Sequence, residues 1–91
     1  MGLVLVIDDD SAVRHAVAQT LELADYVVLT AGSFVEAKDH ITVDFAGVIL
    51  TDVRMPGRDG FYVLDYVQSI DAELPLIILT GEGDIPMAVK A

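Results

Sequence analysis

The sequence contains no cysteine, which excludes disulfides and thiolate metal ligands. Basic residues are also scarce, because five Lys and Arg stand against fifteen Asp and Glu, and the formal net charge is −10. Contacts with nucleic acid phosphates or an anionic membrane surface depend on clustered Lys and Arg. We therefore predict that this segment binds neither nucleic acid nor membrane. The absence of cysteine and of a basic signal-peptide head indicates a cytoplasmic location.

Long apolar runs are missing as well. The longest uninterrupted run, residues 3–7, is far too short to span a membrane, although 54% of the residues are hydrophobic. The apolar residues are therefore expected in short buried strands. Neither an internal repeat nor a linker rich in Gly, Ser or Pro divides the 91 residues. We expect one domain over residues 1–91.

Short runs of apolar, β-branched and aromatic residues predict four strands, over residues 3–7, 26–30, 46–51 and 76–79. Between them, amphipathic spacing or capping signals predict helices over residues 11–24, from Ser33 to about Ile41, and along a stripe of Phe61, Leu64 and Val67. Asp84 and Pro86 indicate the start of a fourth helix. Strict alternation of strands and helices predicts an α/β fold with a doubly wound parallel sheet, truncated after the fourth strand and the start of that helix.

Acidic residues follow two of the predicted strands. Asp8 and Asp9 come directly after residues 3–7, and Asp52 follows residues 46–51. The carboxyl ends of parallel strands share one edge of a sheet, so these three carboxylates are expected to meet there. At about 4 Å each pair repels by roughly 4 kcal/mol at an effective dielectric near 20. Mg²⁺ relieves such repulsion and binds phosphate, so the sequence predicts a Mg²⁺ site at which one Asp accepts a phosphoryl group.

A simpler interpretation of the first acidic cluster remains open. Asp8, Asp9 and Asp10 could be solvated residues at a helix start, favoured there by the helix dipole. Asp10 is expected to be a cap or a solvated neighbour rather than a ligand. His15 and His40 are expected on the surfaces of helices, outside any site, because neither has a second histidine at ligand spacing.

Three motifs of the chain resemble signature motifs of response-regulator receiver domains: Ile-Asp-Asp-Asp at residues 7–10, Leu-Thr-Asp-Val-Arg-Met-Pro-Gly at residues 50–57 with Asp-Gly at 59–60, and Leu-Thr-Gly at residues 79–81. The resemblance covers the whole chain. On residues 44–47 and 80–89 it is nearest to receivers of the DctD group, which is sigma-54-dependent and NtrC-like, with FixJ-type receivers second. It implies a flavodoxin-like, CheY-like fold and a receiver domain over residues 1–91 that is incomplete at its C-terminus.

The resemblance also implies roles for individual residues in two-component signalling. Asp52 would be the phosphorylation site, taking a phosphoryl group from a sensor histidine kinase. Asp8, Asp9, Asp52 and the backbone carbonyl of Arg54 would hold Mg²⁺, and Thr80 would be the switch hydroxyl. Such a domain regulates a transcription-activating output in a phosphorelay, often as a homodimer. It is a regulatory domain rather than an enzyme, although the family assists its own phosphorylation and dephosphorylation.

One departure from the family pattern leaves two alternatives open. The family's strand-ending Lys lies beyond Ala91, and the lysines at positions 38 and 90 match neither that position nor its context. A degenerate receiver used only for protein interaction is therefore one alternative. The other is a phosphatase similar to haloacid dehalogenases, in which Asp8 is the nucleophile and Thr80 binds phosphate.

Overall fold

The computed structural model describes residues 2–42, 45–52, 60–79 and 86–89. Its centre is one five-stranded sheet of order β2-β1-β3-β4-β5. The strands are β1 (Leu3–Ile7), β2 (Val27–Ala31), β3 (Val48–Asp52), β4 (Leu76–Leu79) and β5 (Pro86–Val89). Strands β2, β1, β3 and β4 pair in parallel, as the alternating pattern of strands and helices predicts. The α/β fold class with a doubly wound parallel sheet is therefore confirmed.

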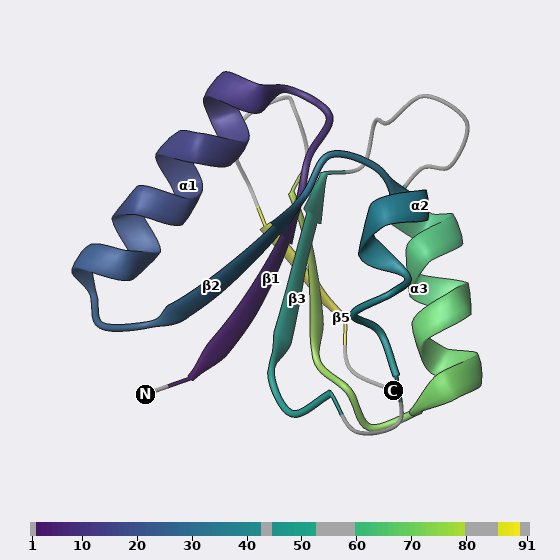
Figure 1. The fold of residues 1–91 in the computed structure, drawn as a ribbon. Helices are drawn as coiled ribbons and strands as arrows, with labels where there is room; N and C mark the ends of the chain where they lie inside the picture. The colour runs from purple at the N-terminus through teal and green to yellow at the C-terminus, as the bar shows by residue number, and fades with distance from the viewer. Residues whose placement is uncertain (1, 43–44, 53–59, 80–85, 90–91) are drawn as a thin grey trace.

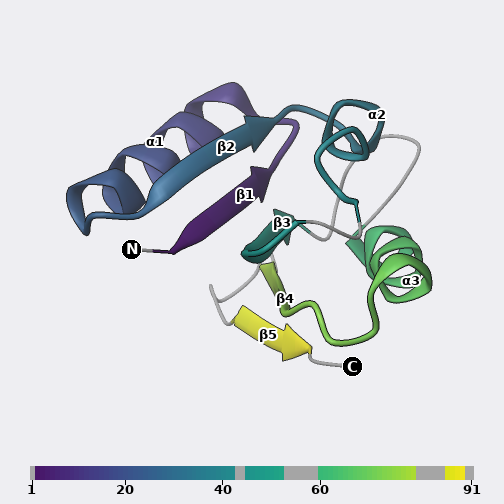
Figure 2. The same cartoon turned by 60° about the horizontal axis from the view of Figure 1, so that its bottom comes forward.

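The helices cover both faces of this sheet. They are α1 (Ser11–Leu23), α2 (Phe34–Ala37) and α3 (Gly60–Ile70). Helix α1 packs on one face, whereas α2 and α3 lie together on the other (Figures 1 and 2). Within the described residues, no helix is both long enough and apolar enough to cross a membrane.

Capping interactions fix both ends of α1. The Asp10 side chain accepts hydrogen bonds from the backbone N–H groups of Ala12 (2.9 Å) and Val13 (3.2 Å), so Asp10 is the N-cap. At the other end Asp25 adopts a positive φ of 71°. The Asp25 N–H donates to the Glu22 carbonyl, and the Tyr26 N–H donates to the Leu21 carbonyl. These two bonds form a Schellman motif, which ends the helix and turns the chain toward β2.

Helix α2 is shorter than the sequence suggests. Half of the expected capping box is present, because the Glu36 N–H donates to the Ser33 hydroxyl; the Glu36 carboxylate accepts instead from the N–H of Gly32, the residue before the N-cap, at 2.9 Å. The helix nevertheless ends at Ala37, so its expected extension to Ile41 is wrong. Ile41 is instead fully buried in the core after a turn, which explains why an apolar residue occurs there.

The buried stripe of α3 also differs from the expected one. Val63 and Val67, one helical turn apart, are completely buried, whereas Phe61 is 44% exposed. Leu64 packs only partly against the core. The helix itself is confirmed at the expected place, but its packing face is rotated by about one residue relative to the expected stripe of Phe61, Leu64 and Val67.

The main core lies between the sheet and the pair α2 and α3. Alternate residues of the strands point into it and are fully buried, including Leu5, Ile49 and Ile78. On the opposite face, Leu50 and Ile77 are cross-strand partners that are only half-buried. Most of the buried apolar side chains therefore lie on the α2 and α3 side of the sheet. Helix α1 contacts mainly β1 and β2.

The segment after β4 contradicts one detail of the expected fold. In place of the start of a fourth helix near Asp84 and Pro86, residues Pro86–Val89 form β5, which pairs antiparallel with β4. Pairing satisfies the outer backbone groups of β4, which an unpaired edge would leave open. Pro86 is the first residue of this edge strand, a position at which its missing N–H costs little.

Candidate functional site

The register of the central strands brings two acidic residues together. Ile7 of β1 lies opposite Thr51 of β3, so the next residues, Asp8 and Asp52, lie side by side at the carboxyl ends of the two strands. Carboxylate oxygens of Asp8, Asp9 and Asp52 all lie within 4.8 Å of one another. The structure thus assembles the three carboxylates at the carboxyl edge of the parallel strands, where open α/β sheets bind their ligands.

The three carboxylates have different surroundings. Asp8 is only 8% exposed, Asp52 is half-buried and Asp9 is exposed. The Asp8 backbone N–H bonds to the Ala31 carbonyl at 3.1 Å, and its Oδ1 accepts from the N–H of Asp10 at 2.9 Å. Asp8 is therefore the fixed member of the cluster, and Asp9 has the greatest freedom to turn toward a ligand.

Burial raises the pKa of the Asp8 carboxyl above its ordinary value, and repulsion from Asp52, Asp9 and Asp10 adds to the shift. The hydrogen bond from the Asp10 N–H opposes this effect and lowers the pKa. Because burial and like charge both disfavour the ionised form, the site is electrostatically unfavourable when it holds only its own side chains. A cation at this point would remove that penalty.

The donor set fits Mg²⁺. Ligand oxygens around an octahedral Mg²⁺ ion lie at most about 4.2 Å apart, since each bond is about 2.0–2.1 Å long. The carboxylate oxygens of Asp8, Asp9 and Asp52 lie within 4.8 Å of one another, close to that separation, and Asp9 is exposed. Few protein oxygens are available, which suits an ion that keeps several waters and takes the rest of its shell from phosphate.

Comparison with known proteins agrees with this geometry. The family model described as "Response regulator receiver domain" matches residues 4–91. The chain belongs to this receiver family. It is 48% identical over 88 residues to the C4-dicarboxylate transport transcriptional regulatory protein DctD of Rhizobium meliloti, which confirms the resemblance to the DctD group. Regulators named FixJ are also among the relatives.

Solved structures of receivers share the fold. A receiver domain protein of Clostridium thermocellum is 34% identical with a TM-score of 0.85, over 92% of this chain and 68% of that one. The response regulator TrrA of Thermotoga maritima, determined in complex with Mg²⁺-BeF, is 25% identical with a TM-score of 0.84, over 91% of this chain and 72% of that one. By contrast, the match to DctD covers 97% of this chain but only 19% of DctD, so the relative is far longer than the receiver.

Two expected site residues lie outside the described part of the chain, and three residues expected outside the site can be placed. Arg54 and Thr80 are outside the described residues, so their roles stay predictions. Asp10 caps α1, as expected, and its carboxylate is not part of the cluster. His15 is exposed on α1, whereas His40 follows the short α2 rather than lying on it, so its expected place on a helix is wrong.

Sequence reasoning missed two residues that border the cluster. Thr51 is completely buried next to Asp52, and its hydroxyl donates to the Asp52 carbonyl at 3.1 Å. Arg14 reaches back from α1, and its Nη1 donates to the backbone carbonyl of Asp8 at 2.7 Å. The available signal for Arg14 was a single cation one turn into a helix that directly follows the acidic residues.

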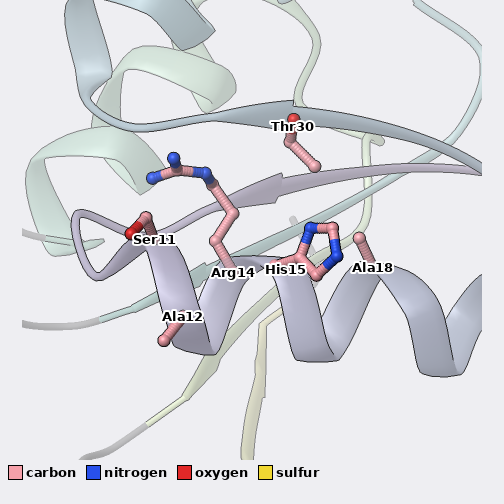
Figure 3. Close-up of a pocket in the computed structure, with 6 residues that line it drawn as sticks. All are labelled: Ser11, Ala12, Arg14, His15, Ala18 and Thr30. Carbon is pink, nitrogen blue, oxygen red and sulfur yellow. The ribbon is translucent and has the colours of Figure 1, made fainter.

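A separate hollow lies along the seam between α1 and β2. Its volume is about 600 Å³, and its lining includes Arg14, His15 and Thr30 (Figure 3). The three carboxylates do not line it, so this hollow is distinct from the acidic cluster. Arg14 connects the two regions, because it lines the hollow and its guanidinium donates to the Asp8 carbonyl.

Proposed function

We propose that this chain is a Mg²⁺-dependent phospho-acceptor receiver of two-component signal transduction, with Asp52 as the residue that takes a phosphoryl group from a sensor histidine kinase. The observation that carries the proposal is the meeting of the Asp8, Asp9 and Asp52 carboxylates at the carboxyl edge of the sheet, within 4.8 Å. The Mg²⁺-BeF complex of TrrA supports it, since that protein shares the fold.

The proposed reaction needs a nucleophile and a means of neutralising charge. An oxygen of Asp52 attacks the phosphorus of a phosphohistidine, the P–N bond breaks, and the released imidazole takes a proton from solvent. Asp8 and Asp9, with Asp52 and the carbonyl of Arg54, would hold the metal. Bound Mg²⁺ supplies positive charge that offsets repulsion between the phosphoryl oxygens and the carboxylates.

The proposed output is a change of surface near the site. A phosphoryl group on Asp52 adds a charge of about −1.5 to −2 and three acceptor oxygens, enough to draw a hydroxyl such as that of Thr80. The role of the domain is regulatory: in a cytoplasmic phosphorelay it controls a transcription-activating output of the kind found in the DctD relatives, and it does so as a homodimer. The relatives' names support the regulatory part.

A phosphorylation assay tests the proposal. The chain is incubated with acetyl phosphate and Mg²⁺, and its intact mass is measured. We expect the mass of one added phosphoryl group in the wild type, and no adduct when Mg²⁺ is chelated before the incubation or in Asp52→Asn. Asp65→Asn on the exposed surface of α3 is the matched control and should behave like the wild type.

The same assay separates the two chemistries that the sequence leaves open. An adduct that persists in Asp52→Asn but disappears in Asp8→Asn would overturn the receiver proposal and favour a phosphatase-like nucleophile. Complete absence of an adduct, with no Mg²⁺ binding in calorimetry, would favour a degenerate receiver that acts only through protein contacts.

A further inference from the structure

Arg14 makes a hydrogen bond that the proposed chemistry does not use. It lies in the second turn of α1, its side chain is half-buried, and its Nη1 donates to the Asp8 carbonyl at 2.7 Å. This bond spans the point where the chain leaves β1 and enters α1. Figure 3 shows the Arg14 side chain extending from α1 toward the strands.

The bond completes a set of restraints on one metal-binding candidate. The backbone N–H of Asp8 is held by the Ala31 carbonyl, its carboxylate by the Asp10 N–H, and its carbonyl by Arg14. Neither of the first two fixes the plane of the peptide that joins Asp8 to Asp9. The bond from Arg14 does so, because it holds the carbonyl oxygen of that peptide in one direction.

The partner of the Arg14 guanidinium is a backbone carbonyl rather than a carboxylate. The bond therefore restrains the direction of a peptide group.

We propose that Arg14 is a positioning residue for the Mg²⁺ site: by holding the Asp8 carbonyl, it fixes the peptide between Asp8 and Asp9 and so sets the direction of both carboxylates. The inference rests on the proposed function, because it assumes that these carboxylates bind Mg²⁺. Outer partners of metal ligands act in this way, and their loss typically weakens metal binding by 10- to 100-fold.

Calorimetric titration of MgCl₂ into the full chain tests the inference, with Arg14→Gln compared against Lys38→Gln. Both substitutions remove one positive charge, but Lys38 is exposed at the end of α2, away from Asp8. We expect the dissociation constant for Mg²⁺ to rise about tenfold in Arg14→Gln, and to change little in Lys38→Gln. Arg14→Lys, which keeps a donor on a shorter side chain, should restore part of the affinity.

The sign of the change separates positioning from charge. If Arg14 acted only as a nearby cation, its removal would relieve repulsion of Mg²⁺ and tighten binding. Tighter or unchanged binding in Arg14→Gln would therefore overturn the inference while leaving the receiver proposal intact. Absence of Mg²⁺ binding in the wild-type chain would overturn both. Circular dichroism of each variant establishes that a loss of binding is measured on folded protein.

Gly32 provides a second test that keeps the Arg14 side chain. A Cβ at this position would lie 3.1 Å from Arg14 Nη1, and the backbone there is outside the left-handed region, so an alanine crowds the guanidinium without straining the main chain. We expect Gly32→Ala to weaken Mg²⁺ binding less than Arg14→Gln does. In the double variant the losses should not add, since both act through one hydrogen bond; additive losses would contradict the inference.

Discussion

Ile7 and Thr51 are partners in the parallel register of β1 and β3, and both are buried in the face of the sheet that packs against α2 and α3. A slip of β3 by one residue against β1 would turn Ile49 and Thr51 to the other face of the sheet, so the core fixes the register. The same register determines that Asp8 and Asp52 emerge together. The packing of apolar residues thus holds the carboxylates in place against their mutual repulsion.

The first prediction concerns the cost of that repulsion. Asp8→Asn removes one charge from the cluster but keeps an oxygen that can accept from the Asp10 N–H. We expect the metal-free variant to melt several °C above the wild type, at roughly 4–8 °C per kcal/mol for a domain of this size. Thermal denaturation with and without Mg²⁺ checks this. The wild type should gain stability with Mg²⁺, whereas the variant should gain little.

The pH dependence of stability provides a second prediction. Because burial and like charges raise the pKa of Asp8 in the folded state, the folded chain binds a proton more readily than the unfolded chain does. The contribution of Asp8 to stability is then present at low pH and is lost as the pH rises through the raised pKa. The stability advantage of Asp8→Asn over the wild type should shrink as the pH falls from neutral to about 4. Urea denaturation at each pH measures that difference, and a gap that widens instead would contradict the assigned direction.

The sequence alone located the strands that carry the site. β1 and β4 have the predicted bounds, and β2 and β3 are each shifted by one or two residues, since buried parallel strands read as unbroken apolar runs. The position of Asp52 at a strand end followed directly from this pattern. The distance between Asp52 and Asp8 could not be predicted from this pattern, because the register of the strands depends on contacts between segments more than forty residues apart.

Other features depended on tertiary packing that no local pattern reveals. Helix α2 has the Ser33 cap that the sequence predicts but ends at Ala37, and Ile41 is buried from the turn that follows, although its spacing from Phe34 and Ala37 would also suit a longer helix. Residues Pro86–Val89 carry helix-start signals, yet they form a strand that pairs with the edge of β4. The hydrogen bond of Arg14 could not be predicted, because its partner is a backbone carbonyl, which leaves no trace in the sequence.

The third prediction tests whether Asp10 acts as a helix cap or as a metal ligand. Because its side chain caps α1 through the N–H groups of Ala12 and Val13, Asp10→Ala should cost about 1 kcal/mol of stability. Asp10→Asn keeps an acceptor and should cost much less. Chemical denaturation measures both. Calorimetry on the same variants should show Mg²⁺ binding within about twofold of the wild type, and a much larger loss would make Asp10 a metal ligand after all.

The last prediction concerns the opposite end of β3. A Cβ on Gly47 would overlap the Leu3 carbonyl oxygen and lie 3.0 Å from the Leu3 Cβ, so the start of β3 can approach β1 only with glycine there. Such overlap with backbone cannot be relieved by a rotamer change, and Gly47→Ala should cost about 1–3 kcal/mol.

Gly2→Ala is the matched control, because its Cβ would meet only the exposed Tyr26 ring at 3.3 Å, which can move. Denaturation of both variants should show a large loss for Gly47→Ala alone. The folded fraction of that variant should retain Mg²⁺ binding, because Asp52 lies at the far end of the strand; equal stability of the two variants would mean that β1 and β3 have room for a side chain at this point.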